Sequence, residues 1–135
     1  MGILLLIEIK LVRLLSNFDK QIEERMFGQK IEVYKDFLKA FNWANSNQEI
    51  EEFWALIAPM KEIKSIRDAM THDLSKVSIN SAELQQTVSY IRNQRPDLFQ
   101  TFSHAQDEEL KSLSAIAVFG FLFSERLAGI RCELQ

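Results

Sequence analysis

The sequence predicts an all-α protein with one domain covering residues 1–135. Its 135 residues are 47% apolar and 26% charged, values close to those of ordinary globular domains. It contains only four Gly and two Pro, too few for the many turns of a β-sandwich or barrel. Apolar residues also recur at three- and four-residue spacings, the period of amphipathic helices. We therefore expect a helical bundle of about five helices.

The first expected element covers residues 4–41 and is either one long helix or two collinear helices. Its apolar residues keep helical spacing along this whole stretch. Gly28 is the weak point, because glycine costs roughly 1 kcal/mol relative to alanine inside a helix. We expect any kink or break there. Glu8 and Lys10 interrupt the apolar start of the chain, so this stretch does not predict a signal peptide.

Two helices are expected next. Ser46 and Glu49 form a capping-box pattern, which predicts a helix beginning near Asn47. Pro59 lies either in the first turn of the following helix or at a kink in a continuous one. The apolar stripe of this second helix is expected to contain Met60, Ile63, Ile66, Arg67, Met70 and Leu74.

The remaining sequence predicts two more helices. Asn80 and Glu83 resemble a cap, and the helix that follows should end before Pro96. Residues 103–106 (SHAQ) predict another capping box, and the last helix then runs to about Cys132. Its middle, residues 113–123, is apolar nearly all round, so it is either the central core helix or is covered by a second subunit. This stretch is shorter than the roughly 20 residues needed to cross a bilayer, so no membrane association is expected.

The composition also limits the chemistry. A formal net charge of −3 gives no global basic field, so a nucleic acid would need a local positive patch. One cysteine, Cys132, and two histidines, His72 and His104, cannot form a disulfide framework or a usual four-ligand zinc site. We expect no metal, no cofactor and a reducing, cytoplasmic setting.

One cluster carries the residue types of a reactive site. Arg67 lies where the apolar stripe predicts a hydrophobic residue, so it must meet a carboxylate or line a polar cavity or interface. Asp68 and His72 are four residues apart and share a helical face, where the carboxylate can orient the imidazole. Arginine binds phosphate oxygens with two donors, and histidine exchanges protons near neutral pH. The cluster is therefore suited to phosphate chemistry.

Residues 67–72 (RDAMTH) resemble the R-(N/D/H)-x3-H motif of the HEPN superfamily, and the apolar helix at residues 54–66 is similar to the context of that motif. This resemblance implies a small, all-α, homodimeric protein that cleaves RNA without a metal, through attack of the 2′-hydroxyl on the adjacent phosphate. It implies that Arg67 stabilises the transition state, that His72 is the general acid or base, and that Asp68 orients them. Toxin or defence biology, and a protein antitoxin or regulator as partner, are implied in the same way.

Four further residues near the motif are candidate contacts to the ribose or phosphate: Lys64, Thr71, Asp73 and Lys76. Leu74 stands where toxins of the minimal HEPN and nucleotidyltransferase pairs carry tyrosine, which argues against that subfamily. The segment also has a weaker resemblance to the mannitol-operon repressor family, which is all-α.

The alternative is a non-catalytic helical interaction module. Arg67 would then form an interhelical ion pair, with a glutamate of the first element such as Glu23 or Glu24. His72 would be a helix C-terminal histidine stabilised by the helix dipole.

Overall fold

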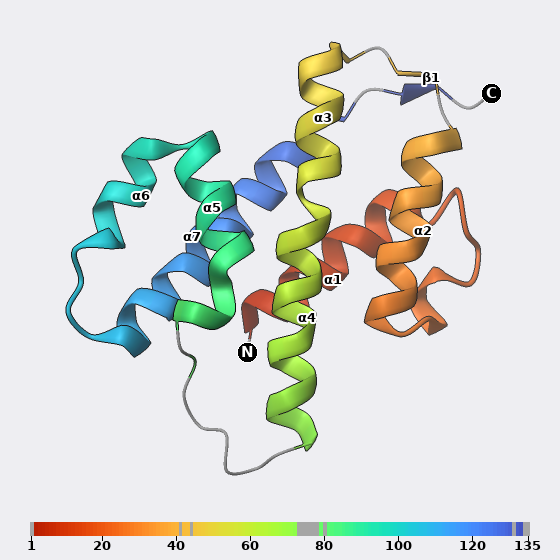
Figure 1. Ribbon diagram of the computed structural model, residues 1–135. Coiled ribbons are helices and arrows are strands. Elements are labelled where there is room, and N and C mark those ends of the chain that lie inside the picture. Colours follow the sequence, from red (N-terminus) through yellow and green to blue (C-terminus); the bar gives the residue numbers. More distant parts are fainter. Residues whose placement is uncertain are drawn as a thin grey trace.

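The computed structural model is an all-α helical bundle, which confirms the predicted fold class (Figure 1). The structure describes residues 2–40, 42–43, 45–72, 79, 81–130 and 132–133. These residues form seven α-helices, two more than expected: α1 (Gly2–Leu15), α2 (Phe27–Ala40), α3 (Asn47–Ala55), α4 (Ile57–His72), α5 (Gln85–Gln94), α6 (Pro96–Ser103) and α7 (Glu108–Ala128). Two 3-10 helices, η1 (Ile22–Glu24) and η2 (Ser81–Leu84), complete the helical elements.

The N-terminal element is a pair of helices, but the predicted break at Gly28 is wrong. The chain leaves α1 after Leu15, and Asp19 stabilises the connection by accepting a hydrogen bond from the backbone N–H of Gln21 (3.1 Å) and pairing with Arg25. Gly28 lies inside the first turn of α2. A Cβ atom at Gly28 would lie 2.9 Å from Cε of Lys64, so this glycine allows α4 to send a side chain close to α2.

The two central helices begin as predicted. Ser46 caps α3, and its hydroxyl accepts from the backbone N–H of Glu49 while Glu49 accepts from the backbone N–H of Ser46, both at 3.2 Å. Pro59 is the third residue of α4 and therefore lies in its first turn. Figure 1 shows α3 and α4 nearly end to end in the middle of the molecule, with α2 on one side and α5 and α6 on the other.

The C-terminal half contains a helix that the sequence did not predict. As expected, α5 ends before Pro96, but Pro96 then opens α6, because proline suits the first position of a helix. The predicted cap at Ser103 is wrong, since Ser103 is the last residue of α6. Asp107 caps α7 instead, accepting from the backbone N–H groups of Glu109 (2.9 Å) and Leu110 (3.1 Å). The predicted cap at Asn80 lies outside the described residues.

Helix α5 is capped by a side chain of α4, a helix that is separate in sequence but packs against it. Glu62 of α4 accepts hydrogen bonds from the backbone N–H groups of Gln86 (2.8 Å) and Thr87 (2.9 Å), in the first turn of α5. A helix starts with unpaired N–H groups and a partial positive charge, so a carboxylate there stabilises it. Glu62 thus fixes the position of α5 against α4.

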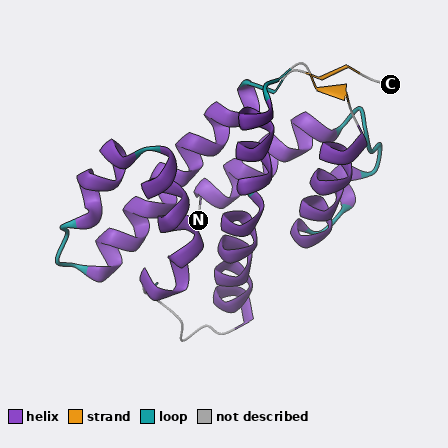
Figure 2. Cartoon of the chain, turned by 45° about the horizontal axis from the view of Figure 1, so that its top comes forward, coloured by secondary structure: helices purple, strands orange, loops and turns teal. Residues whose placement is uncertain are grey.

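The last helix, α7, packs into the core along one face, while Leu113 and Phe121 in its apolar middle are exposed. Its buried face includes Ile116, Phe119, Leu122 and Phe123, and α1 packs along it. The helix ends at Ala128 rather than near Cys132, because residues 132–133 form strand β2 (Cys132–Glu133), antiparallel to β1 (Asn42–Trp43). Figure 2 shows this strand pair at one end of an otherwise helical structure.

Some large apolar side chains remain exposed on two helices. On α1 they are Leu5, Leu6 and Ile9, and on α7 they are Leu110, Leu113 and Phe121. Within the described ranges, no helix is both long enough and apolar enough to cross a membrane.

Candidate functional site

The candidate site is centred on Arg67, near the C-terminal end of α4. Helix α4 runs without interruption from Ile57 to His72, so Arg67 and His72 lie on one rigid element. Met60, Ile63 and Ile66 point into the core. The prediction that Arg67 shares this buried stripe is wrong: its side chain lies at the edge of the core and is 43% exposed. A guanidinium group there keeps part of its hydration, so the cost of full burial is avoided.

Arg67 contacts a carboxylate of α1. Its Nη1 donates to Oε1 of Glu8, whose side chain is only 15% exposed. The other carboxylate oxygen of Glu8, Oε2, accepts from Nζ of Lys30 at 2.7 Å, and the Lys30 side chain is 6% exposed. One carboxylate therefore connects α1, α2 and α4. A glutamate of the first element does pair with Arg67, as the alternative predicted, but it is Glu8 of α1 rather than Glu23 or Glu24 of η1.

The two cations keep Glu8 ionised. Burial alone would raise the pKa of Glu8, but hydrogen bonds from Lys30 and Arg67, together with their positive charges, outweigh it and lower the pKa below its ordinary value. Glu8 is thus a permanent anion at neutral pH, and it holds both basic groups in place.

Two further contacts define the surroundings of Arg67. The guanidinium carbon lies 5.7 Å from the ring centre of Phe27, in the range of a cation–π interaction. Lys64, one turn earlier on α4, donates to Oδ2 of Asp68, and its aliphatic chain lies over Gly28. We call this set the Arg67 cluster, formed by Glu8, Phe27, Lys30, Lys64, Arg67 and Asp68.

The structure brings together three of the seven predicted site residues, namely Lys64, Arg67 and Asp68. His72 and Thr71 are the last two residues of α4, but their side chains lie outside the described structure. Asp73 and Lys76 lie outside the described residues altogether. The predicted pairing of Asp68 with His72 stays a prediction, while the structure shows Asp68 bonded to Lys64.

Sequence reasoning missed Glu8, Phe27 and Lys30. One signal was available: Glu8 interrupts the apolar start of α1, and Lys30 precedes Tyr34 and Phe37 at the spacing of the buried face of α2. Charged residues at buried positions of two neighbouring helices suggest an ion pair. Among the described residues, no group of three or more His, Cys, Asp and Glu side chains is arranged to hold a metal ion.

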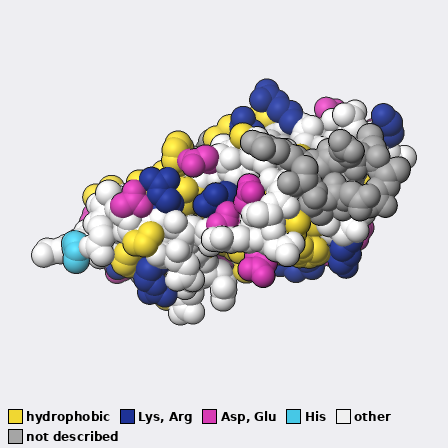
Figure 3. Space-filling model, turned by 90° about the horizontal axis from the view of Figure 1, so that it is seen from above, with side chains coloured by type: hydrophobic (Ala, Val, Ile, Leu, Met, Phe, Trp, Pro, Cys, Tyr) yellow, Lys and Arg dark blue, Asp and Glu magenta, His cyan; other side chains and the backbone are white. Residues whose placement is uncertain are grey.

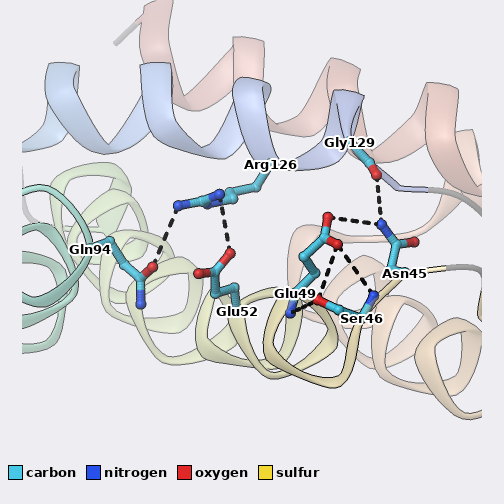
Figure 4. Close-up of polar contacts among 7 residues, drawn as sticks. All are labelled: Asn45, Ser46, Glu49, Glu52, Gln94, Arg126 and Gly129. Atoms are coloured by element: carbon cyan, nitrogen blue, oxygen red, sulfur yellow. Dashed lines mark hydrogen bonds and ion pairs between the residues drawn. The ribbon is translucent and has the colours of Figure 1, made fainter.

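A second polar network lies at the other end of the bundle (Figure 4). Arg126 of α7 pairs with Glu52 of α3 at 3.1 Å and donates to Gln94 of α5 at 3.5 Å. Asn45 donates to the backbone oxygen of Gly129 at 2.9 Å, which fastens the end of α7 to the start of α3. These contacts join helices to one another, so we assign them a structural role.

The surface shows no broad basic area on the face drawn in Figure 3, where Lys and Arg side chains alternate with Asp and Glu. Two arginines near the end of α5 have partners of their own: Arg95 pairs with Asp97 at 3.0 Å, and Arg92 lies over the ring of Phe99. The Arg67 cluster, in contrast, contains three cations, Lys30, Lys64 and Arg67.

No protein-family model matches this chain, and no curated protein or solved structure is significantly similar to it. The chemical interpretation therefore depends on the geometry around Arg67.

Proposed function

We propose that the protein is a HEPN-like, metal-independent endoribonuclease that uses Arg67 and His72 on the scissile phosphate of RNA. The observation that carries this proposal is the placement of Arg67. Its guanidinium group is held by Glu8 and Phe27, yet 43% of its side chain stays exposed, near the end of the helix that ends at His72. A preorganised and accessible cation is what a developing phosphate charge requires.

The proposed reaction is an internal transfer at phosphorus. The 2′-oxygen attacks the adjacent phosphorus while its proton passes to a base, and the bond from phosphorus to the 5′-oxygen breaks as that oxygen gains a proton. His72 serves one of these proton transfers, because imidazole titrates near neutral pH. Arg67 stabilises the charge on the phosphate oxygens, and Asp68 orients the pair. The products are a cyclic phosphate and a free 5′-hydroxyl.

Partners and setting belong to the same proposal. Two copies would place their Arg67 and His72 residues at a shared two-fold interface built on exposed apolar helix surface. RNA is the substrate, a protein antitoxin or regulator is the controlling partner, and the setting is cytoplasmic.

Incubation of the purified protein with total RNA in EDTA tests the proposal. The wild type should release fragments with cyclic phosphate ends, and His72→Ala should abolish this release. His104→Ala is the matched control, because His104 is exposed and its imidazole bonds Gln100, one turn earlier on the chain. Arg67→Ala should also abolish cleavage while the protein stays folded. No cleavage by the folded wild type, or equal cleavage by His72→Ala, contradicts the proposal.

One observation favours the alternative of a non-catalytic interaction module. The bond between Arg67 and Glu8 connects residues 59 positions apart and helps to join α1 to α4. If this is its only role, Arg67→Ala lowers stability and no RNA is cleaved. Measuring unfolding and cleavage on the same variant separates the two functions.

A further inference from the structure

A pocket adjoins the Arg67 cluster on the side of α1. It has a volume of about 340 Å³ and is lined by Leu5, Glu8, Ile9, Val12, Arg13, Glu23 and Lys30. This size is within the range of small-molecule sites. Glu8 belongs both to the pocket wall and to the pair with Arg67. The Glu8 carboxylate therefore lies between the pocket and the guanidinium group of Arg67.

The wall of the pocket is amphipathic. Leu5, Ile9 and Val12 recur at helical spacing on α1, and Leu5 is 60% exposed while Ile9 is 38% exposed. They offer apolar surface that costs free energy while it faces water. A planar ring that is apolar on its faces and polar at its edge fits such a surface.

The polar lining consists of Glu8, Arg13, Glu23 and Lys30, of which Lys30 is the buried one. An ammonium group has three donors. Among the described residues the Lys30 ammonium donates only to Glu8, although the residue is 5% exposed. Two donors of a buried cation thus remain for a ligand that enters the pocket, and they require an acceptor such as a carbonyl oxygen.

We propose that this pocket binds the nucleobase next to the phosphate held by Arg67, and that it prefers bases with a carbonyl oxygen. Uracil, guanine and cytosine each carry such an oxygen, whereas adenine has none. The ring packs on the apolar side chains of α1, and Lys30 donates to its carbonyl oxygen. This inference rests on the proposed ribonuclease function, because it assigns the phosphate to Arg67.

Binding of mononucleotides to the intact protein tests the proposal without cleavage. Titration calorimetry would compare uridine, guanosine and adenosine monophosphates with ribose phosphate, which lacks a base. Uridine and guanosine monophosphates should bind about tenfold more tightly than adenosine monophosphate, the effect of one hydrogen bond to a charged donor. Ribose phosphate, which also lacks the ring, should bind most weakly. Equal affinity for all four probes overturns the proposal.

Two variants locate the binding. Ile9→Asp puts a charge on the apolar wall at an exposed position and should remove the advantage of uridine and guanosine monophosphates over ribose phosphate. Leu110→Asp, at an exposed apolar position of α7, is the matched control and should leave that advantage unchanged. Lys30→Met should remove the preference over adenine, and Ile9→Asp keeps the test available if Lys30→Met does not fold. If Ile9→Asp retains full base-dependent affinity, the pocket is not the site.

The same experiments separate this inference from the proposed function. Base-dependent binding without any RNA cleavage would support the nucleotide pocket and contradict the proposed ribonuclease function. RNA cleavage with no difference in affinity among the bases would support the ribonuclease function and contradict the pocket proposal.

Discussion

Glu8 offers the sharpest test of the Arg67 cluster, because its two partners differ in burial. The Lys30 side chain is 6% exposed and the Arg67 side chain is 43% exposed. Replacing Glu8 by Gln leaves the buried ammonium of Lys30 without its carboxylate. Removing one partner of a buried pair costs about 3–5 kcal/mol. Because Glu8 itself keeps some contact with water, we expect Glu8→Gln to lower the free energy of unfolding at neutral pH by about 2–4 kcal/mol.

The matched variant is Arg67→Gln, which removes the exposed partner of the same carboxylate. An ion pair with an exposed side chain contributes about 0–1 kcal/mol to the free energy of unfolding. In Arg67→Gln, Glu8 also keeps its bond to Lys30. Urea unfolding followed by far-UV circular dichroism measures both differences. If both variants lose the same free energy of unfolding, or if Glu8→Gln loses none, the buried pair of Glu8 with Lys30 does not stabilise the fold more than the exposed pair with Arg67.

The pH dependence has a definite sign. The folded-state pKa of Glu8 lies below its ordinary value of 4.5, so its ionised form stabilises the folded state. This contribution is complete above pH 4.5 and is lost as the pH falls from there through the folded-state pKa. The stability difference between wild type and Glu8→Gln should therefore shrink in acid. A difference that stays constant over this range would show that packing, rather than charge, accounts for the loss.

Four other substitutions test the fold and the site. Glu62→Ala removes the distant cap of α5 and should cost about 1–2 kcal/mol in urea unfolding, whereas no effect would deny the capping role. Asp107→Ala should cost about 1 kcal/mol and Ser103→Ala close to nothing, because Asp107 is the observed cap of α7; the reverse order would favour the cap predicted from sequence. Gly28→Ala gains about 1 kcal/mol of helix propensity but pushes Lys64 aside, so its net stability change should be small and RNA affinity should fall. Unchanged affinity in Gly28→Ala would show that Lys64 does not contact RNA.

The elements predicted correctly are those whose determinants are local. The capping box of Ser46 and Glu49 closes within four residues, so the pattern is sufficient. The same pattern at Ser103 was misleading, because Pro96 starts an additional helix that uses Ser103 as its last residue. The break expected at Gly28 failed for a different reason. A propensity difference of roughly 1 kcal/mol is easily exceeded by the packing of α2 against α4.

The candidate site was predictable only in part, for the same physical reason. The motif on α4 is continuous in sequence, so Arg67 and Asp68 were singled out from their spacing and Lys64 from its place near the motif. The partner of Arg67 was not, because Glu8 lies 59 positions away and is selected by the packing of α1 beside α4. The need for a carboxylate was deduced correctly from the cost of burying a charge. Which carboxylate provides it depends on the tertiary structure.

The charge of the Arg67 cluster connects the structural and the catalytic interpretations. The cluster contains three cations, Lys30, Lys64 and Arg67, and two carboxylates, Glu8 and Asp68, which leaves one positive charge in a chain whose net charge is −3. A phosphodiester carries one negative charge and would neutralise the cluster. The excess belongs at Arg67, the most exposed of the three cations, where a phosphate would approach.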